Sequence, residues 1–341
     1  MTCTAAILGC AGHTVTPAEK AFFAEACPWG FILFARNIAS PEQVRALTAE
    51  LRWIVRRADA PILVDQEGGR VQRLGPPHWR RYPPGRAYGA LAAGDPLLRR
   101  ETARLGGRLI AHDLAALGIN VNCLPVLDVP DPLGHEVIGD RAYGEDADDV
   151  ALLGRAAAEG LIAGGVLPVI KHIPGHGRAK ADSHLDLPVV EAGWDELEAR
   201  DFAPFRALSD MPMAMTAHVI YAAVDAARPA TTSRSVLRRV VRGAIGFQGL
   251  VMTDDLSMKA LGGGFRERAQ AARAAGCDVV LHCNGDLAEM KAVVEGAGRL
   301  RGRALRRAES ALARLPKAQE PFDAVAGRAR FDAAFEGRWA A

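Results

Sequence analysis

The chain has 341 residues, of which 49% are hydrophobic and 24% are charged, and its 42 Lys and Arg nearly balance its 40 Asp and Glu. This composition excludes a chain dominated by disorder, and a net charge of +2 leaves no basic surface typical of a nucleic-acid or anionic-membrane binder. No run approaches the roughly 20 apolar residues of a membrane span, and no Lys or Arg precedes the first apolar run as in a signal peptide. We therefore expect a cytoplasmic globular protein with a small ligand.

The cysteines form no Cys-x-x-Cys pair, and most of them stand in apolar runs. We expect reduced thiols in the core rather than a disulfide framework. The six cysteines are Cys3, Cys10, Cys27, Cys123, Cys277 and Cys283.

Short apolar runs, typical of buried parallel strands, alternate with longer segments in which apolar residues recur every three or four positions. In chain order the expected strands are 4–8, 31–35, 61–65, 119–127, 167–172, 213–218, 250–254 and 278–282. The expected helices include 41–57, 96–117, 147–163, 194–208, 235–245, 266–275 and 287–300. Eight such units predict an α/β fold, a (β/α)8 TIM barrel over residues 1–300. A doubly wound open sheet is the alternative, but no Gly-x-Gly-x-x-Gly follows the first strand.

Residues 301–341 follow this barrel as a short helical tail. A helix is expected at 301–315, and a proline-interrupted polar segment follows it. We expect the tail to pack on the barrel, or to form a contact between copies, and to carry no chemistry.

Polar residues follow six of the expected strands at their C-terminal ends, where TIM barrels carry their sites. These ends read Asp65-Gln66-Glu67, Asp128, Lys171-His172, His218, Thr253-Asp254-Asp255 and His282-Cys283-Asn284. Any one of them alone could be a solvated strand end. Six at one rim indicate a ligand site.

The densest cluster of titratable residues follows the fifth expected strand. Asp182 and His184 are two positions apart and share a face of an extended segment, so the carboxylate can orient the imidazole for proton transfer near neutral pH. A hydrogen bond that only stabilises the loop is the plainer alternative. A third interpretation is a metal site, since His172 and His176 could join this pair as ligands. The glycines predict a mobile loop at 175–184.

Carboxylates and arginines at two other strand ends suit sugar recognition. Asp254 and Asp255 point to opposite faces of their strand, so one can face a pocket while the other goes to solvent or to a helix N-terminus. Asp65, with an arginine from the following loop, can bind sugar hydroxyls, and Arg141 is a further donor. We expect Arg70 to form surface ion pairs.

Three motifs resemble glycoside hydrolase family 3, and within it the bacterial cytoplasmic β-N-acetylglucosaminidases. They are Lys171-His172-Ile173-Pro174-Gly175-His176-Gly177, Asp182-Ser183-His184 and Thr253-Asp254-Asp255-Leu256-Ser257-Met258. The stretches 64–73 and 215–219 fit the same pattern, and the resemblance covers about residues 5–300. Ile173 departs from the usual Phe, which changes packing but no functional group.

This resemblance implies a retaining glycosidase that forms a covalent glycosyl-enzyme. It assigns Asp254 as the nucleophile, His184 as the acid/base and Asp182 as the group that orients His184. It assigns the binding of N-acetylglucosamine to Asp65, Arg73, Arg141, Lys171 and His172.

The implied substrate is N-acetylglucosaminyl-1,6-anhydro-N-acetylmuramic acid, with or without a peptide, a fragment of recycled peptidoglycan. We expect a monomer that uses no cofactor and no metal. Three alternatives stay open: a β-N-acetylglucosaminide phosphorylase on the same scaffold, a metal-dependent TIM-barrel hydrolase, and a non-catalytic sugar-binding barrel.

Overall fold

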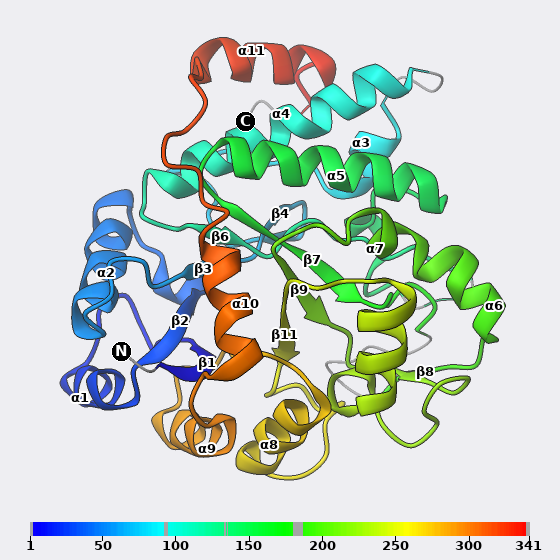
Figure 1. The fold of residues 1–341 in the computed structure, drawn as a ribbon. Helices are drawn as coiled ribbons and strands as arrows, with labels where there is room; N and C mark the ends of the chain where they lie inside the picture. Colours follow the sequence, from blue (N-terminus) through cyan, green and yellow to red (C-terminus); the bar gives the residue numbers. More distant parts are fainter. Residues whose placement is uncertain (1–2, 92–94, 133, 135, 180–186, 339–341) are drawn as a thin grey trace.

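A closed parallel barrel forms the centre of the protein. The computed structural model describes residues 3–91, 95–132, 134, 136–179 and 187–338. In these ranges eight strands close in the order β1-β12-β11-β9-β7-β6-β3-β2, so the predicted TIM barrel is confirmed (Figure 1). The strands are β1 (Thr4–Leu8), β2 (Pro28–Leu33), β3 (Ile62–Val64), β6 (Val121–Asn122), β7 (Leu167–Ile173), β9 (Met213–Thr216), β11 (Leu250–Asp255) and β12 (Val279–His282).

Helices surround the barrel, and most of the longer ones begin at a side-chain cap. The longer ones are α1 (Pro17–Ala26), α2 (Pro41–Ile54), α4 (Pro96–Ala115), α5 (Ala147–Ala163), α8 (Phe265–Ala275) and α9 (Leu287–Ala297). Ser40, Asp95, Asp146 and Asp286 each accept a backbone N–H of the first turn that follows them. Within the described ranges, no helix combines the length and apolarity needed to cross a membrane.

Several elements differ from the sequence-based expectation. The segment expected as one helix at 194–208 consists of α6 (Trp194–Glu196), a π-helical stretch (Leu197–Asp201) and α7 (Ala203–Ala207). Pro204, which has no N–H to donate, stands at the start of α7 and favours this break. The expected helix 235–245 is π-helical over Val236–Ala244. The expected strand 119–127 is reduced to β6.

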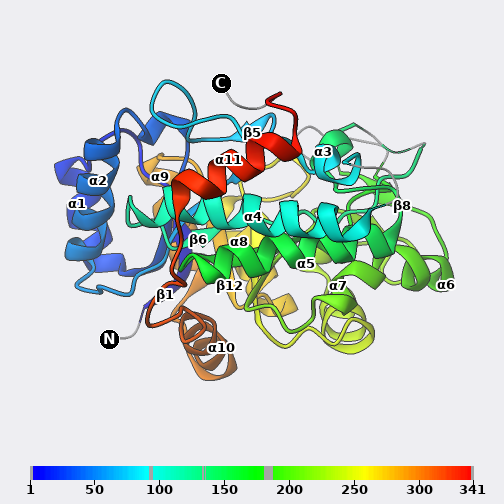
Figure 2. The ribbon, with the colours of Figure 1, turned by 90° about the horizontal axis from the view of Figure 1, so that it is seen from above.

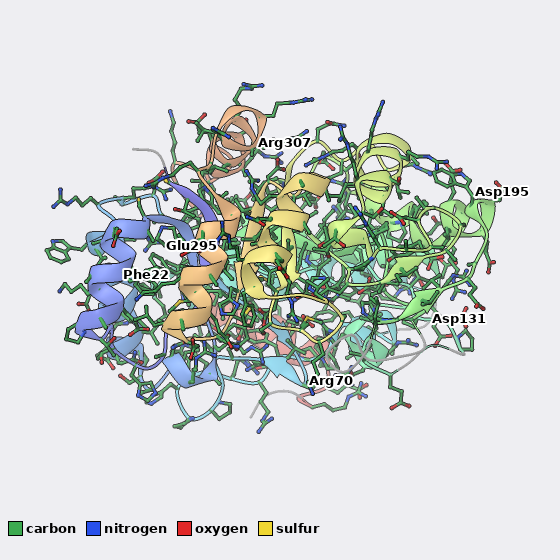
Figure 3. The ribbon with its side chains drawn as sticks, turned by 90° about the horizontal axis from the view of Figure 1, so that it is seen from below. Phe22, Arg70, Asp131, Asp195, Glu295 and Arg307 are labelled. Carbon is green, nitrogen blue, oxygen red and sulfur yellow. The ribbon has the colours of Figure 1, made fainter. Side chains whose placement is uncertain are left out.

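The helix α10 (Gly302–Leu312) covers the end of the barrel where the strands begin. Its Ala308 and Ala311 pack in the same cluster as barrel-interior side chains such as Met213 and Leu250. In Figure 1 α10 lies in front of the strands, and Figure 3 shows Arg307 of α10 on the opposite side of the molecule from Arg70. The tail therefore closes the end of the barrel that faces away from the polar strand ends.

A last helix, α11 (Ala324–Ala334), runs along α4 (Figure 2). Its Phe331 is fully buried, with its ring centroid 6.2 Å from that of Tyr82 and 6.1 Å from that of Tyr88. Asp332 forms an ion pair with Arg80. The polar end of the tail is thus a docked helix, because Phe331 packs against the rings of Tyr82 and Tyr88.

Candidate active site

A pocket of about 140 Å³ opens at the C-terminal ends of the strands. Six of the sequence-predicted site residues line it together: Asp65, Arg73, Arg141, Lys171, His172 and Asp254. They come from β11, from β7 and from the loops that follow β3 and β6. The parallel barrel brings these distant segments to one rim.

Lys171 is the centre of a buried ion-pair network. Its Nζ lies 2.9 Å from Asp65 Oδ1 and 2.6 Å from Glu67 Oε1, and its side chain is 2% exposed. Arg141 forms a two-bond pair with Glu67, at 2.8 and 2.9 Å, and Arg73 Nη2 lies 3.1 Å from Asp65 Oδ2. Each buried carboxylate is therefore matched by two cations.

This network keeps its members charged. Burial opposes ionisation of Asp65, but Lys171 and Arg73 outweigh it and hold the pKa of Asp65 well below its usual value. Burial also opposes charge on Lys171, but Asp65 and Glu67 raise the pKa of Lys171 above its usual value. The pocket thus offers fixed charges and hydrogen-bonding groups that suit a ligand rich in hydroxyl groups.

Asp128 fixes the imidazole of His172. Its Oδ2 lies 2.7 Å from His172 Nδ1, and its Oδ1 accepts the backbone N–H groups of His172 and His176 at 3.2 and 2.7 Å. Burial acts against the charge of Asp128, but His172 and these hydrogen bonds lower the pKa of Asp128 to about 2. An ionised Asp128 holds the proton on Nδ1, which leaves Nε2 of His172 for the pocket.

Asp254 stands at the end of β11 with its carboxylate on the pocket. Its Oδ1 accepts the backbone N–H of Asp255 at 2.8 Å. Burial works to raise the pKa of Asp254, but His172 and this N–H bond contribute to holding it below its usual value. The carboxylate is therefore ionised at neutral pH, as attack on an electrophilic carbon requires.

Asp255 takes a different position from either of those that the sequence suggested. Its carboxylate accepts Ser257 N–H at 3.0 Å, Ser257 O–H at 2.5 Å and Cys283 N–H at 3.1 Å. The expected partner was solvent or a helix N-terminus. Asp255 instead accepts hydrogen bonds from the turn that follows β11 and from the residue that follows β12. Asp255 thus joins the turn after Asp254 to the end of β12.

Two predicted catalytic residues, Asp182 and His184, lie outside the described residues. The segment before them is described up to Ala179, and its His176 ring centroid is 5.8 Å from that of His172. Gly175 accepts a hydrogen bond from the Tyr221 hydroxyl through its carbonyl, at 2.6 Å. Gly175 and His176 are therefore held in place beside Tyr221 and His172.

Sequence reasoning missed Glu67 and Asp128 as site residues. Both were recognised only as polar strand ends, since their partners lie 74 and 44 positions away in the chain. One signal was present for Glu67, because it follows Asp65 by two positions and so shares its face. Arg70 forms an exposed ion pair with Asp140, at 3.6 Å, as expected.

No group of three or more His, Cys, Asp or Glu side chains is arranged to hold a metal ion among the residues described here. Two of the four candidate ligands, Asp182 and His184, lie outside that part of the chain. The metal interpretation is therefore left to experiment.

Comparison with known proteins agrees with this geometry. Residues 18–315 match the glycosyl hydrolase family 3 N-terminal domain. A β-hexosaminidase from Aromatoleum aromaticum is 42% identical over 283 residues, which are 82% of this chain and 78% of that protein.

Solved structures resemble the whole described fold. NagZ from Neisseria gonorrhoeae in complex with a zinc ion has a TM-score of 0.86 and 33% identity, with 98% of both chains covered. NagZ from the same organism in complex with N-trifluoroacetyl-D-glucosamine has a TM-score of 0.80 and 33% identity, also covering 98% of both chains. The chain therefore belongs to glycoside hydrolase family 3 and is a hydrolase of the β-hexosaminidase type.

Proposed function

We propose that this enzyme is a retaining exo-β-N-acetylglucosaminidase that removes terminal N-acetylglucosamine from 1,6-anhydro-muropeptides. In this proposal it acts as a monomer in the cytoplasm, where recycled peptidoglycan supplies the substrate. The observation that carries the proposal is the single pocket that joins an ionised Asp254 to the Asp65–Lys171 network. Its volume of about 140 Å³ is far below the roughly 300–1,000 Å³ of pockets for larger ligands, so it suits one sugar ring.

The proposed sugar contacts follow from the charges in the pocket. Carboxylate oxygens of Asp65 accept hydrogen bonds from ring hydroxyls, and Arg73 and Lys171 donate to hydroxyl oxygens. His172, whose Nδ1 proton is held by Asp128, accepts a hydrogen bond through Nε2. N-trifluoroacetyl-D-glucosamine in the related Neisseria gonorrhoeae protein supports an N-acylated glucosamine as the ring that binds here.

In the first chemical step, a carboxylate oxygen of Asp254 attacks the anomeric carbon. The bond from that carbon to the leaving oxygen breaks, and the protonated His184 gives its proton to that oxygen. In the second step, neutral His184 takes a proton from water while the water oxygen attacks the same carbon and releases Asp254. Two inversions at one carbon retain the β configuration.

The experiment that tests this proposal uses a chromogenic β-N-acetylglucosaminide with and without inorganic phosphate. We expect equal rates in both conditions and N-acetylglucosamine that is formed first as the β anomer, which NMR detects before mutarotation. Product that appears as a sugar phosphate in a phosphate-dependent reaction would contradict hydrolysis, and α anomer as the first product would contradict retention.

A second assay addresses the natural substrate. N-Acetylglucosaminyl-1,6-anhydro-N-acetylmuramic acid should release its terminal sugar, whereas a longer glycan should lose sugars only from its non-reducing end. Internal cleavage of the glycan would contradict an exo-acting pocket.

A further inference from the structure

Two cysteines lie beside each other where the chain enters β1 and β2. Cys3 directly precedes β1, and Cys27 ends α1 directly before β2. The two strands pair in parallel with Thr4 opposite Pro28, and Thr4 N–H donates to the Cys27 carbonyl at 2.9 Å. Neighbouring strands lie about 4.8 Å apart, which is inside the range of about 4.4–6.8 Å between the Cα atoms of a disulfide.

The two thiols also interact with each other. Cys3 is 5% exposed, and both side chains pack against the apolar cluster inside the barrel. Burial raises the pKa of Cys3, and a side-chain hydrogen bond with the Cys27 thiol adds to this rise. The two thiols are therefore neighbours within hydrogen-bonding reach of each other.

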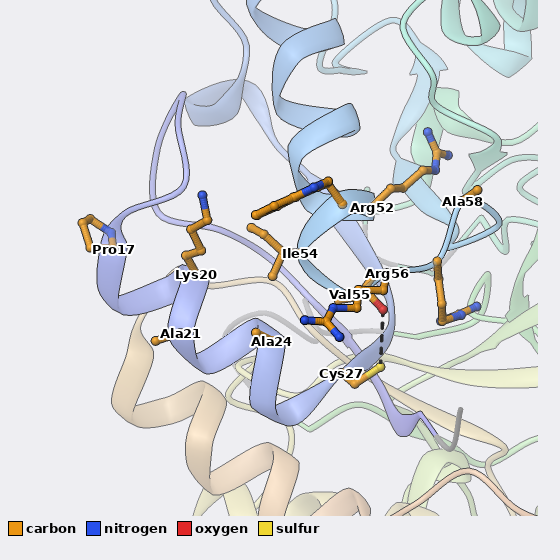
Figure 4. Close-up of a pocket in the computed structure, with 12 residues that line it drawn as sticks. Pro17, Lys20, Ala21, Ala24, Cys27, Arg52, Ile54, Val55, Arg56 and Ala58 are labelled. Carbon is orange, nitrogen blue, oxygen red and sulfur yellow. Dashed lines mark hydrogen bonds between the residues drawn. The ribbon is translucent and has the colours of Figure 1, made fainter.

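Cys27 is the accessible member of this pair. It lines a groove of about 1,400 Å³ between α1 and α2, and Figure 4 shows its sulfur directed at the Val55 carbonyl, 4.0 Å away. The groove is also lined by cationic side chains, namely Lys20, Arg52, Arg56 and Arg57. Reactive cysteines stand in electropositive and partly exposed surroundings, and Cys27 meets both conditions.

The other cysteines offer a contrast. Burial raises the pKa of Cys10 to about 12 and that of Cys277 to about 12, and it raises the pKa values of Cys123 and Cys283 well above their usual value. All four are at most 6% exposed. Their thiols stay protonated and shielded, so an oxidant meets Cys27 first.

We propose that Cys3 and Cys27 are a redox-active dithiol, which hydrogen peroxide entering the α1–α2 groove converts to an intramolecular disulfide. The Cys27 thiolate attacks one peroxide oxygen, the O–O bond breaks, and the hydroxide that leaves takes up the proton lost from Cys27. The Cys3 sulfur then attacks the sulfenic sulfur of Cys27, the S–O bond breaks, and a second water leaves with the Cys3 proton. Two thiols are oxidised by two electrons and one peroxide is reduced to two waters.

This disulfide joins the starts of β1 and β2 at the end of the barrel away from the sugar pocket. It closes the chain from residue 3 to residue 27 into a ring and so restricts the unfolded state. We expect oxidation to raise the melting temperature by a few degrees and to leave turnover of a chromogenic substrate unchanged.

Mass spectrometry of the full chain and of its proteolytic peptides tests the proposal without any sugar. After peroxide treatment and alkylation of the remaining thiols, we expect a peptide that links Cys3 to Cys27 and four alkylated cysteines, and dithiothreitol should restore six. In a Cys3→Ser variant, dimedone should label Cys27 as its sulfenic acid, because the resolving thiol is gone. A Cys10→Ser variant is the matched control and should form the same cross-link as the natural chain.

Four results would overturn the proposal. They are six alkylated cysteines after peroxide, a disulfide between other cysteines, a dimer linked through Cys27, and dimedone labelling of Cys3 in a Cys27→Ser variant. Loss of turnover on oxidation would contradict the expectation that this disulfide leaves the sugar pocket unchanged.

Discussion

Asp254 is the residue whose chemistry the proposed mechanism cannot replace. Asn at this position keeps the size of the side chain but is a poor nucleophile, so no glycosyl-enzyme forms. We expect Asp254→Asn to lower kcat/KM by at least about 10³-fold for both activated and natural substrates. Initial rates on the two substrate types check this, with circular dichroism as a control for folding. A loss confined to one substrate type would show that another group is the nucleophile.

His184 has a role that depends on the leaving group. Its replacement by Ala should lower turnover of natural disaccharides by about 10²–10⁴-fold, because their leaving oxygen needs a proton. A phenolate of low pKa leaves without help, so the aryl substrate should lose less in the first step and a glycosyl-enzyme should accumulate. Azide needs no general base, and it should raise turnover and yield a β-glycosyl azide.

Asp182→Ala should show a weaker version of the same pattern, because His184 then loses its orienting partner. If both substrate classes fall equally in His184→Ala and azide restores nothing, the acid/base is another residue.

Most of the pocket residues that sequence reasoning found stand at a strand end in a motif with other polar residues. Asp65, Lys171 and Asp254 could be placed on one rim because a parallel barrel gathers strand ends. The Glu67–Arg141 pair could not be foreseen, because it depends on how the loop containing Arg141 folds back over 74 positions. A local sequence motif predicts which residues stand at a strand end. Which charged residues form pairs depends on the path of the loops, which the motif does not show.

At the scale of elements, α11 shows how a few apolar residues dock a polar helix. Phe331 is fully buried, whereas Val325 on the same helix is 81% exposed. Phe331→Ala should destabilise the protein by about 3–5 kcal/mol, because it leaves a cavity between Tyr82 and Tyr88. The matched Val325→Ala variant should change stability by less than about 0.5 kcal/mol. Urea unfolding of both variants measures the difference, and equal values would contradict docking of α11.

The same contrast explains which elements could be predicted. Helices with a capping residue and a regular apolar period begin where expected, and α5 (Ala147–Ala163) also ends where expected, whereas α2 and α9 each end three residues earlier than expected. The segment 194–208 has the same period but contains Pro204, and its backbone changes to π-helical turns. The apolar period of a segment thus predicts which face of a helix is buried. The pattern of backbone hydrogen bonds within that helix depends on single residues such as Pro204.

At the scale of the whole molecule, the proposed reaction needs only side chains of this chain. We expect full turnover after exhaustive chelation, because Asp254 supplies the nucleophile and His184 the proton. Rates before and after chelation, with the metal content measured in parallel, check this. Loss of turnover that zinc restores would instead support a metal-dependent hydrolase.

The fold as a whole was the most predictable level, because eight alternations of strand and helix leave few closed arrangements. The sequence did not predict that α10 covers the end of the barrel where the strands begin. Its apolar residues recur at helical spacing, but the sequence does not show what they cover, and only the open end of the finished barrel gives Ala308 and Ala311 a place to pack.

The buried charges predict how stability responds to pH. Asp65, Glu67 and Asp128 all have pKa values below their usual ones in the folded protein, so the stability they contribute is present above about pH 4 and is lost as pH falls. The pKa of Lys171 is raised, so its contribution is complete below about pH 10.4 and is lost only as pH rises above that value. Near neutral pH these four groups therefore add no slope to the free energy of unfolding.

Acid should then weaken the protein with a slope of about 1.4 kcal/mol per pH unit for each extra proton that the unfolded chain binds. Asp128→Asn removes one such group while keeping an oxygen that can accept from the His172 and His176 backbone. Its slope between pH 4 and pH 3 should be smaller than that of the natural chain by up to about 1.4 kcal/mol per pH unit, whatever its stability at pH 7. Urea unfolding at each pH provides the slopes. Identical slopes would mean that Asp128 takes up its proton equally in both states, and that its pairing with His172 does not hold it ionised.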